Sequence, residues 1–311
     1  MRAAILHGPG DLRVEQVPDP EGEVVVAVHA ATTCGTDVKM WRHGHRILAP
    51  YPCAFGHETA GERVDTGEPV LVSDSVPCGV CPPCRNERPQ ICRAPTWVLG
   101  GFAELVAAPV GAIHAVPDGL PAAAAAMAEP LAAAIHALAR GSDAEDVGVL
   151  GGGAMGLMLA ALLIGEGRTV TLADPHAERR EQAESIGARA AERLSTHALV
   201  FEAVGRPGAW RTAIEAAEPG AVVVLVGGCP PGNEVALPAD QVHYEELDLR
   251  GSFHHSRQEV DRALALLGSG AFDWRLLAGE TIGLEQLPAA LASTAKGRAR
   301  KWIIDPRRPP S

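Results

Sequence analysis

The spacing of hydrophobic and polar positions changes near residue 120 of the chain. Upstream, short apolar runs are separated by segments rich in Gly and Pro, which is typical of strands joined by turns. The pattern predicts strands within residues 24–34 (VVVAVHAATTC), 61–64 (GERV), 69–76 (PVLVSDSV) and 102–117 (FAELVAAPVGAIHAVP). Residues 121–141 (PAAAAAMAEPLAAAIHALARG) instead predict a helix, which Pro130 kinks or divides.

Strands and helices alternate from residue 147 onward. Apolar runs at 147–151, 169–174, 198–205, 221–227 and 247–253 predict strands, and residues 154–167 and 177–187 predict helices between them. This alternation predicts a doubly wound parallel sheet in an α/β fold. Helices near 259–267 and 284–295 and a last strand at 300–305 (RKWIID) follow. This tail is long enough to return to the first part of the chain.

Composition narrows the classes of protein that remain. The chain has 311 residues, of which 47% are hydrophobic, enough for two domains with large cores. Its net charge of -11 and the lack of a basic stripe exclude a nucleic-acid partner. The uncharged run 147–165 has the length of a membrane span, but its clustered glycines predict a strand, a tight turn and a buried helix. The N-terminal residues lack an apolar signal core, so we expect a cytoplasmic protein without membrane contact.

Four cysteines lie close together in the segment 78–92 (CGVCPPCRNERPQIC). The spacing C-x2-C-x2-C-x7-C allows four thiolates to surround one tetrahedral zinc ion. Disulfides are the alternative, but nothing else in the chain indicates an oxidising compartment. We therefore predict a closed, structural zinc site formed by Cys78, Cys81, Cys84 and Cys92.

A glycine-rich turn follows the first strand of the alternating region. Gly151, Gly153 and Gly156 form G-x-G-x-x-G, with Ala154 and Met155 at the start of the next helix. In this context the motif predicts a dinucleotide site, with the pyrophosphate at the helix N-terminus.

An acid follows the second strand of the same region. Asp174 lies where an acid binds the ribose hydroxyls, so NAD is favoured over NADP, although Arg179 and Arg180 weaken that preference. The alternative for Asp174 is a helix N-cap, and for Arg180 a solvated helix face.

Three further side chains are suitable ligands for a second zinc ion. Cys34, in the segment ATTCGTDVK, supplies a thiolate, and His57 and Glu58, in FGHETAG, supply an imidazole and a carboxylate. Taken singly, each has a simpler interpretation, because lone Cys and His residues are usually buried parts of a core.

Five motifs in one order give the chain a resemblance to a known family. CGTD (34–37), GHE (56–58), the four-cysteine segment, EPLA (129–132) and the glycine motif follow one another along the chain. In this the chain resembles the zinc-dependent medium-chain dehydrogenases, the superfamily of alcohol and polyol dehydrogenases. The resemblance implies a GroES-like catalytic domain of residues 1–121 and 255–311 and a Rossmann domain of residues 122–254. It also implies an active site in the cleft between the two.

The resemblance also implies roles for single residues. Cys34 and His57 would bind the catalytic zinc, and Glu58 would be either a ligand or directly behind the metal. Glu129 lies where alcohol dehydrogenases have a cysteine and polyol dehydrogenases a glutamate; the alternative for Glu129 is a charge that favours a helix N-terminus. Thr36 would pass on the substrate proton, whereas Lys39 replaces the histidine that is often the next relay member. For Lys39 three roles stay open: a relay if a nearby metal lowers its pKa, a contact to cofactor phosphate, or a side chain that faces solvent.

The resemblance finally implies cofactors, substrate and assembly. Two zinc ions per chain and NAD would serve hydride transfer with a secondary alcohol or ketone, and Gly227 would line the nicotinamide pocket. The polyol branch suggests a polyol, cyclitol or aminocyclitol. A simple alcohol or aldehyde dehydrogenase, a biosynthetic ketone reductase and a catalytically inactive nucleotide-binding protein are the alternatives. By analogy with relatives, we expect a homodimer or homotetramer.

Overall fold

The computed structural model describes residues 1–297 and 300–309, and the chain divides into two compact units. Unit 1 comprises Met1–Pro130 and Ser256–Ser311, and unit 2 comprises Leu131–His255. The first boundary therefore falls inside a helix, later than the expected position after residue 121, and the second lies one residue from the expected position.

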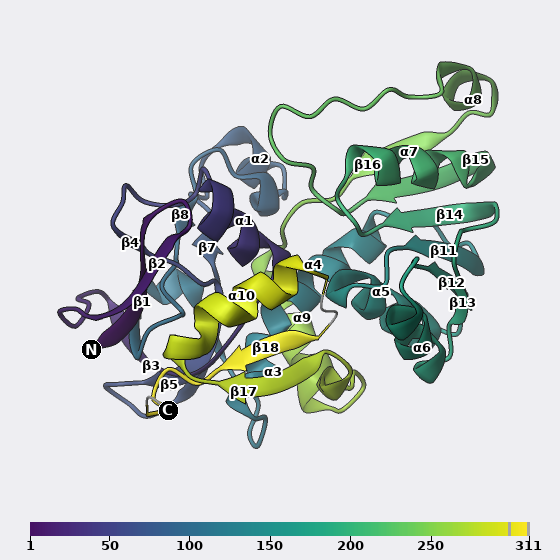
Figure 1. Cartoon of the computed structure of the whole chain (residues 1–311). Helices are drawn as coiled ribbons and strands as arrows, with labels where there is room; N and C mark the ends of the chain where they lie inside the picture. Colours follow the sequence, from purple (N-terminus) through teal and green to yellow (C-terminus); the bar gives the residue numbers. More distant parts are fainter. Residues whose placement is uncertain (298–299, 310–311) are drawn as a thin grey trace. The chain divides into compact units, whose positions relative to one another are not determined.

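Unit 1 consists mainly of antiparallel strands, drawn in purple, blue and yellow in Figure 1. A three-stranded sheet has the order β2-β1-β4, a two-stranded sheet joins β7 and β8, and a seven-stranded sheet has the order β10-β6-β5-β3-β18-β17 with β9 beside β3. The strands are β1 (Arg2–Gly8), β2 (Asp11–Gln16), β3 (Val24–Thr32), β4 (Cys53–Ala54), β5 (Glu58–Arg63), β6 (Pro69–Val72), β7 (Ser75–Val76), β8 (Thr96–Trp97), β9 (Leu105–Ala108), β10 (Ile113–Ala115), β17 (Ala278–Ile282) and β18 (Lys301–Ile304).

The strand nearest the end of the chain completes the largest sheet of unit 1. β18 lies antiparallel to β3, with Ile303 opposite Thr32, and β5 lies on the other side of β3, with Glu58 opposite the same Thr32. This register brings the two ends of the sequence together, as the length of the tail predicted. Thr32, the last residue of β3, therefore has β5 on one side and β18 on the other.

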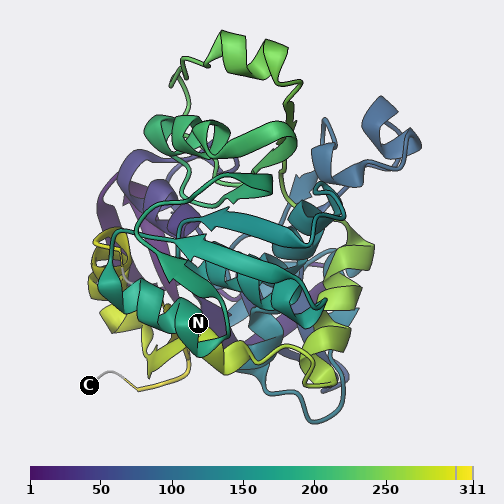
Figure 2. The same cartoon turned by 90° about the vertical axis from the view of Figure 1, so that its right-hand side faces the viewer.

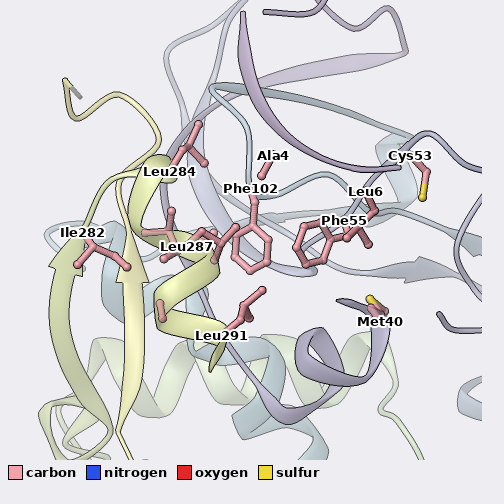
Figure 3. Packing of buried hydrophobic residues seen from close by; sticks show 13 residues of the cluster. Ala4, Leu6, Met40, Cys53, Phe55, Phe102, Ile282, Leu284, Leu287 and Leu291 are labelled. Carbon is pink, nitrogen blue, oxygen red and sulfur yellow. The ribbon is translucent and has the colours of Figure 1, made fainter. Parts of the chain in front are cut away.

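The helices of unit 1 include one that covers an apolar core. These elements are α1 (Gly35–His43), α2 (Pro82–Arg85), η1 (Pro89–Ile91), η2 (Val110–Ala112), α3 (Ala122–Ala126), α9 (Arg257–Gly268), η3 (Trp274–Leu276), η4 (Leu284–Gln286) and α10 (Leu287–Ala295), and α4 (Ala128–Ala139) begins here. Figure 3 shows Leu287 and Leu291 of α10 directed toward Phe55, Phe102 and Met40. Because Leu287 and Leu291 are four residues apart, one face of α10 is buried in this core.

The Ala-rich helical segment is divided at Met127 rather than at Pro130. Pro130 is the third residue of α4, in the first turn, where a missing backbone N–H leaves no hydrogen bond unmade. Our expectation that Pro130 itself breaks or kinks the helix is therefore wrong. Taken together, Ala122–Ala139 is long and apolar enough to cross a membrane, but 72% of this stretch is buried inside the structure, as in a core helix.

Unit 2 is the predicted doubly wound sheet. Its six strands have the order β13-β12-β11-β14-β15-β16, and each neighbouring pair is parallel. Figure 2 shows these strands side by side in teal and green. The elements are β11 (Asp146–Leu150), α5 (Ala154–Gly165), β12 (Thr169–Ala173), α6 (Ala177–Ser185), β13 (Arg189–Ala191), β14 (His197–Glu202), α7 (Pro207–Glu215), β15 (Ala217–Leu225), α8 (Ala239–Tyr244) and β16 (Asp248–Gly251).

The sheet order of unit 2 determines where a ligand binds. Strand order reverses between β11 and β14, which are neighbours in the sheet but not in the sequence. In open sheets of this kind, ligands bind beyond the carboxyl ends of the strands at such a reversal. The glycine motif directly follows β11 and therefore lies at this position.

Candidate functional site

Cys34 is held by the first turn of α1. It is the N-cap residue: its Sγ accepts a hydrogen bond from the backbone N–H of Thr36 at 3.2 Å. The carboxylate of Asp37 reaches back to accept from the Cys34 N–H at 2.7 Å. CGTD is therefore a capping box in which a thiol replaces the usual hydroxyl, and this fixes both side chains relative to the helix.

His57 lies between Cys34 and Asp37. Its Nε2 is 3.3 Å from the Sγ of Cys34, and its Nδ1 is 3.1 Å from Oδ1 of the fully buried Asp37. Tetrahedral zinc would hold a sulfur and an imidazole nitrogen about 3.5 Å apart, so the pair fits this metal. The Asp37 carboxylate thus lies beside Nδ1, while Nε2 is the ring nitrogen that faces Cys34 and could bind a metal.

The pocket around His57 favours positive charge. Burial alone would lower the pKa of His57, yet Cys34 and Asp37 together raise this pKa well above its usual value. A cation such as zinc would be stabilised by the same groups.

Glu58 belongs to a buried network that involves Lys301 and Thr32. Its Oε1 accepts from Nζ of Lys301 at 2.7 Å, and its Oε2 accepts a short hydrogen bond from the hydroxyl of Thr32. Burial would lower the pKa of Lys301, but the carboxylate of Glu58 raises it above its usual value, so the ammonium stays charged. Both carboxylate oxygens of Glu58 are thus engaged by residues of neighbouring strands.

Glu129 joins this group from the first turn of α4. Possible ligand atoms of His57, Glu58 and Glu129 lie within 4.8 Å of one another, as do those of Cys34, Asp37 and His57. Glu129 is only 7% exposed, and it lies in the first turn of α4, where the helix-terminus alternative also places it. The structure therefore brings together Cys34, the neighbours His57 and Glu58, and Glu129, which come from three separate parts of the sequence. Thr36 and Lys39 are half-buried on α1, one turn apart.

The four cysteines of segment 78–92 also converge. Sγ of Cys81 lies 3.4 Å from that of Cys84 and 3.8 Å from that of Cys92, too far for disulfides. Tetrahedral zinc–thiolate geometry separates two sulfurs by about 3.8 Å, so the quartet fits zinc. Hydrogen bonds from the N–H groups of Arg93 and Cys84 lower the pKa of Cys81 to about 6, whereas burial and the hydrogen bond with Cys81 raise the pKa of Cys84 to about 12. Of these two thiols, Cys81 is therefore the one that favours the thiolate form.

The glycine motif has the geometry that a bound pyrophosphate requires. Gly151 has a φ of +105°, which favours glycine, and a Cβ on Gly156 would overlap the carbonyl oxygen of Gly151. A Cβ on Gly153 would meet nothing within 4 Å, which leaves open space above the start of α5. Ala154 and Met155 are the first residues of that helix, where backbone N–H groups are free to bind an anion.

Asp174 connects this turn to the next helix. It is 2% exposed, and its carboxylate accepts from the N–H groups of Gly152 and His176, each at 2.9 Å, and from the Arg179 guanidinium at 2.9 Å. Burial raises the pKa of Asp174, but these hydrogen bonds outweigh it and leave the pKa below its usual value. The N-cap of α6 is His176, so the capping alternative for Asp174 is wrong.

The two arginines near Asp174 are not free on the surface. Arg179 contacts the Asp174 carboxylate, and Nη1 of Arg180 donates to the carbonyl oxygens of Asp174 and Pro175, each at 2.9 Å. A solvated helix face, the alternative for Arg180, is therefore wrong.

The sequence analysis did not single out three buried residues: Asp37, Lys301 and Glu202. Asp37 and Lys301 lie beside the predicted zinc ligands, and Glu202 is the last residue of β14. Asp37 lies inside the recognised CGTD motif, and its place in a capping box was a usable signal. The signals for the other two residues are weaker. Lys301 is a charged residue next to an apolar strand segment, and Glu202 directly follows four apolar residues.

Family models and relatives cover most of the chain. A model for the alcohol dehydrogenase GroES-like domain matches residues 20–118, and one for zinc-binding dehydrogenases matches residues 154–269. An L-threonine 3-dehydrogenase of Chelativorans sp. (strain BNC1) is 30% identical over 98% of each chain. A sorbitol dehydrogenase of Bacillus subtilis (strain 168) is 28% identical over 99% of this chain and 98% of the relative.

A solved structure is similar over the same extent. The zinc-binding dehydrogenase of Sinorhizobium meliloti 1021, bound to NADP, has a TM-score of 0.90 and 28% identity, over 98% of this chain and 99% of that one. The fold of both units is thus that of an NAD(P)-binding dehydrogenase.

Proposed function

Because the chain belongs to the zinc-dependent medium-chain dehydrogenase family, we propose that it transfers hydride between NAD(H) and the carbinol carbon of a polyol, cyclitol or aminocyclitol. The observation that carries this proposal is that the half-buried Cys34 and the buried Glu58 and Glu129 all lie close to the buried His57. A thiolate, an imidazole and carboxylates at this separation are suited to zinc that keeps a position for substrate.

We infer the roles of the residues from their contacts. Zinc, when held by Cys34, His57 and Glu129, supplies the Lewis acidity that favours loss of a proton from an alcohol. Asp37 orients His57, while Lys301 and Thr32 hold Glu58 behind the ligands. Thr36, fixed by the first turn of α1, accepts the substrate proton. Lys39, one turn later, takes the relay position.

The polyol assignment rests on Glu129. A carboxylate in place of a third soft ligand gives an oxygen-rich zinc shell, and a sorbitol dehydrogenase is among the relatives. A 2-amino-3-hydroxy acid is the second substrate class to test, because relatives of 30% identity are L-threonine 3-dehydrogenases. Both classes present a secondary hydroxyl with a neighbouring polar group.

The cofactor assignment rests on Asp174. Its buried, ionised carboxylate would repel a 2′-phosphate, which supports NAD. Arg179 offsets part of that charge. We expect Asp174→Ala to shift the ratio of kcat/KM for NAD and NADP toward NADP; an unchanged ratio would mean that Asp174 only joins the glycine turn to α6.

The cysteine quartet would hold the second, structural zinc. Thiolates of this kind persist in a reducing compartment, so we assign the protein to the cytoplasm.

Metal content and turnover test the proposal together. Purified enzyme should hold about two zinc ions per chain and reduce NAD with a member of a panel of polyols, cyclitols and L-threonine. Cys34→Ser should abolish turnover and remove about one zinc ion, whereas Cys53→Ala, which changes a cysteine of the apolar core, should keep both. Full activity of Cys34→Ser would contradict a catalytic zinc at this site. NADH binding without catalytic-site metal would instead favour an inactive nucleotide-binding protein.

A further inference from the structure

A fully buried carboxyl group lies beside the predicted dinucleotide site and has no part in the chemistry described so far. Glu202 is the last residue of β14 and is 0% exposed. Burial of such a group is unfavourable unless hydrogen bonds compensate for it. The contacts of Glu202 therefore indicate what this position does.

Glu202 joins two loops through both its side chain and its backbone. Its Oε1 accepts from the N–H groups of Val204 and Gly205, each at 2.8 Å. Its backbone carbonyl accepts from the N–H groups of Val226 and Gly227, each at 2.9 Å. One residue thus holds the loop that follows β14 and the loop that follows β15.

The two loops pack so closely that only glycines fit between them. Gly205 has a φ of +76°, and a Cβ there would lie 2.8 Å from the carbonyl oxygen of Gly228. A Cβ on Gly227 would lie 2.6 Å from the Cα of Gly205 and 2.7 Å from Oε2 of Glu202. Nε1 of Trp210 donates to the Gly227 carbonyl at 2.8 Å and adds a further restraint.

The second carboxylate oxygen of Glu202 lies next to Gly227 of the loop after β15. Oε2 is buried and has no hydrogen-bond partner among the described residues. Burial raises the pKa of Glu202, although the N–H groups of Gly205, Val204 and Gly227 oppose this effect. An unpaired buried acceptor costs about 1–3 kcal/mol, so stability alone is a poor reason for a carboxylate here.

The position in the sheet relates Glu202 to the ligand. Glu202 lies in register with Leu150 of β11 on one side and with Leu225 of β15 on the other. The glycine motif begins directly after Leu150, and Ala203 N–H donates to the Leu150 carbonyl at 2.9 Å. Glu202 is therefore at the strand-order reversal, where dinucleotides bind, and on the β14–β15 side of the glycine turn.

We propose that Glu202 is a positioning residue for the nicotinamide half of the cofactor: it fixes the loops after β14 and β15, on which that half rests. The adenosine half depends on the glycine turn and Asp174, on the other side of the reversal. The inference rests on the proposed function only in assuming that this unit binds a dinucleotide.

Two ligands distinguish this role from a general loss of structure. NADH contains the nicotinamide and ADP-ribose lacks it. We expect Glu202→Ala to weaken the binding of NADH about tenfold and to change the binding of ADP-ribose little. The reason is that loop hydrogen bonds of about 1 kcal/mol each are lost only at the nicotinamide side. Glu202→Gln keeps an acceptor for Val204 and Gly205 and should restore most of the NADH affinity. Affinities are measured by NADH fluorescence and by calorimetry for ADP-ribose.

His197→Gln provides the matched control. His197 is buried at the opposite end of the same strand, with 2% exposure, so it reports on disturbance of β14 alone. The affinity of the His197→Gln variant for NADH should equal that of the wild type. If Glu202→Ala does not fold, Glu202→Asp, whose shorter side chain withdraws the carboxylate, takes its place with the same expected difference.

The outcomes separate this inference from the proposed function. Equal weakening of both ligands, unchanged NADH binding, or failure of Glu202→Gln to restore it would overturn the role of Glu202. A wild-type protein that binds neither ligand would overturn the dinucleotide site itself, and with it both proposals.

Discussion

Lys301 and Glu58 form a buried ion pair whose members are 243 positions apart in the sequence. The ammonium is 4% exposed and the carboxylate 1%. The register of β3 explains their meeting: β18 and β5 lie on its two sides, so residues from distant parts of the chain face one another. The pair lies beside the predicted metal ligands, and the contact with Lys301 fixes the orientation of the Glu58 carboxylate.

Replacement of Lys301 by methionine should be strongly destabilising. Removing one member of a buried pair leaves the other charge uncompensated, which lowers the free energy of unfolding by about 3–5 kcal/mol. Urea unfolding measures the change. Lys296→Met is the matched control, since Lys296 is an exposed lysine of the same C-terminal segment and should change little. Equal stability of the two variants would mean that Lys301 does not hold Glu58 as described.

Residues inside local motifs could be predicted from the sequence, and residues brought in by strand register could not. Cys34 and His57 were identified because their neighbours define compact motifs with metal-binding chemistry. Lys301 has no such neighbours, and its partner depends on a pairing between β3 and β18 that no local pattern specifies. The engagement of both Glu58 oxygens likewise became visible only with the fold.

At the scale of elements, residues 75–97 around the four cysteines form a lobe, the cysteine lobe, that contains only short elements. It consists of α2, η1 and the two-stranded sheet of β7 and β8, and none of these elements is longer than four residues. Its cysteines are half-buried and do not form an apolar core, so the stability of this lobe would come from metal binding. Its order should therefore depend on zinc.

Cys81→Ser tests this dependence. We expect zinc content to fall from about two ions to about one per chain, because a thiolate ligand is lost. The thermal midpoint should fall, while NADH affinity stays unchanged, since the dinucleotide features lie in unit 2. Metal analysis, thermal unfolding and NADH fluorescence measure the three quantities. Cys53→Ala is the control for loss of a cysteine, and a Cys81 variant as stable as wild type would contradict a structural role.

Elements with strong periodicity were predicted, and short exposed ones were not. β11, α5, β12 and α6 follow the expected ranges closely because buried strands and helices leave clear apolar patterns. β13 and β17 were missed: both are short strands with mixed exposure, and their existence depends on a neighbour in the sheet. β1 and β2 were missed too, although they have seven and six residues; their antiparallel pairing defines them.

At the scale of the whole molecule, the candidate chemistry is divided between the two units. The predicted zinc ligands, from Cys34 to Glu129 and including the cysteine quartet, belong to unit 1. The glycine motif, Asp174 and Glu202 belong to unit 2, which one continuous segment forms. Each unit has its own sheets and core, so we predict that the dinucleotide features of unit 2 bind the cofactor without any metal ligand.

Metal removal should therefore separate binding from turnover. Dialysis against a zinc chelator is expected to abolish turnover, because the Lewis acid is lost, yet to change NADH affinity by no more than about twofold. Zinc added back should restore turnover, which controls for irreversible damage. NADH fluorescence and zinc analysis on the same samples provide the comparison. If NADH binding disappears in proportion to zinc, the dinucleotide surface depends on metal-bound unit 1, and the division of chemistry between the units is wrong. If binding persists while turnover follows the zinc content, the metal acts in the reaction and not in holding the cofactor.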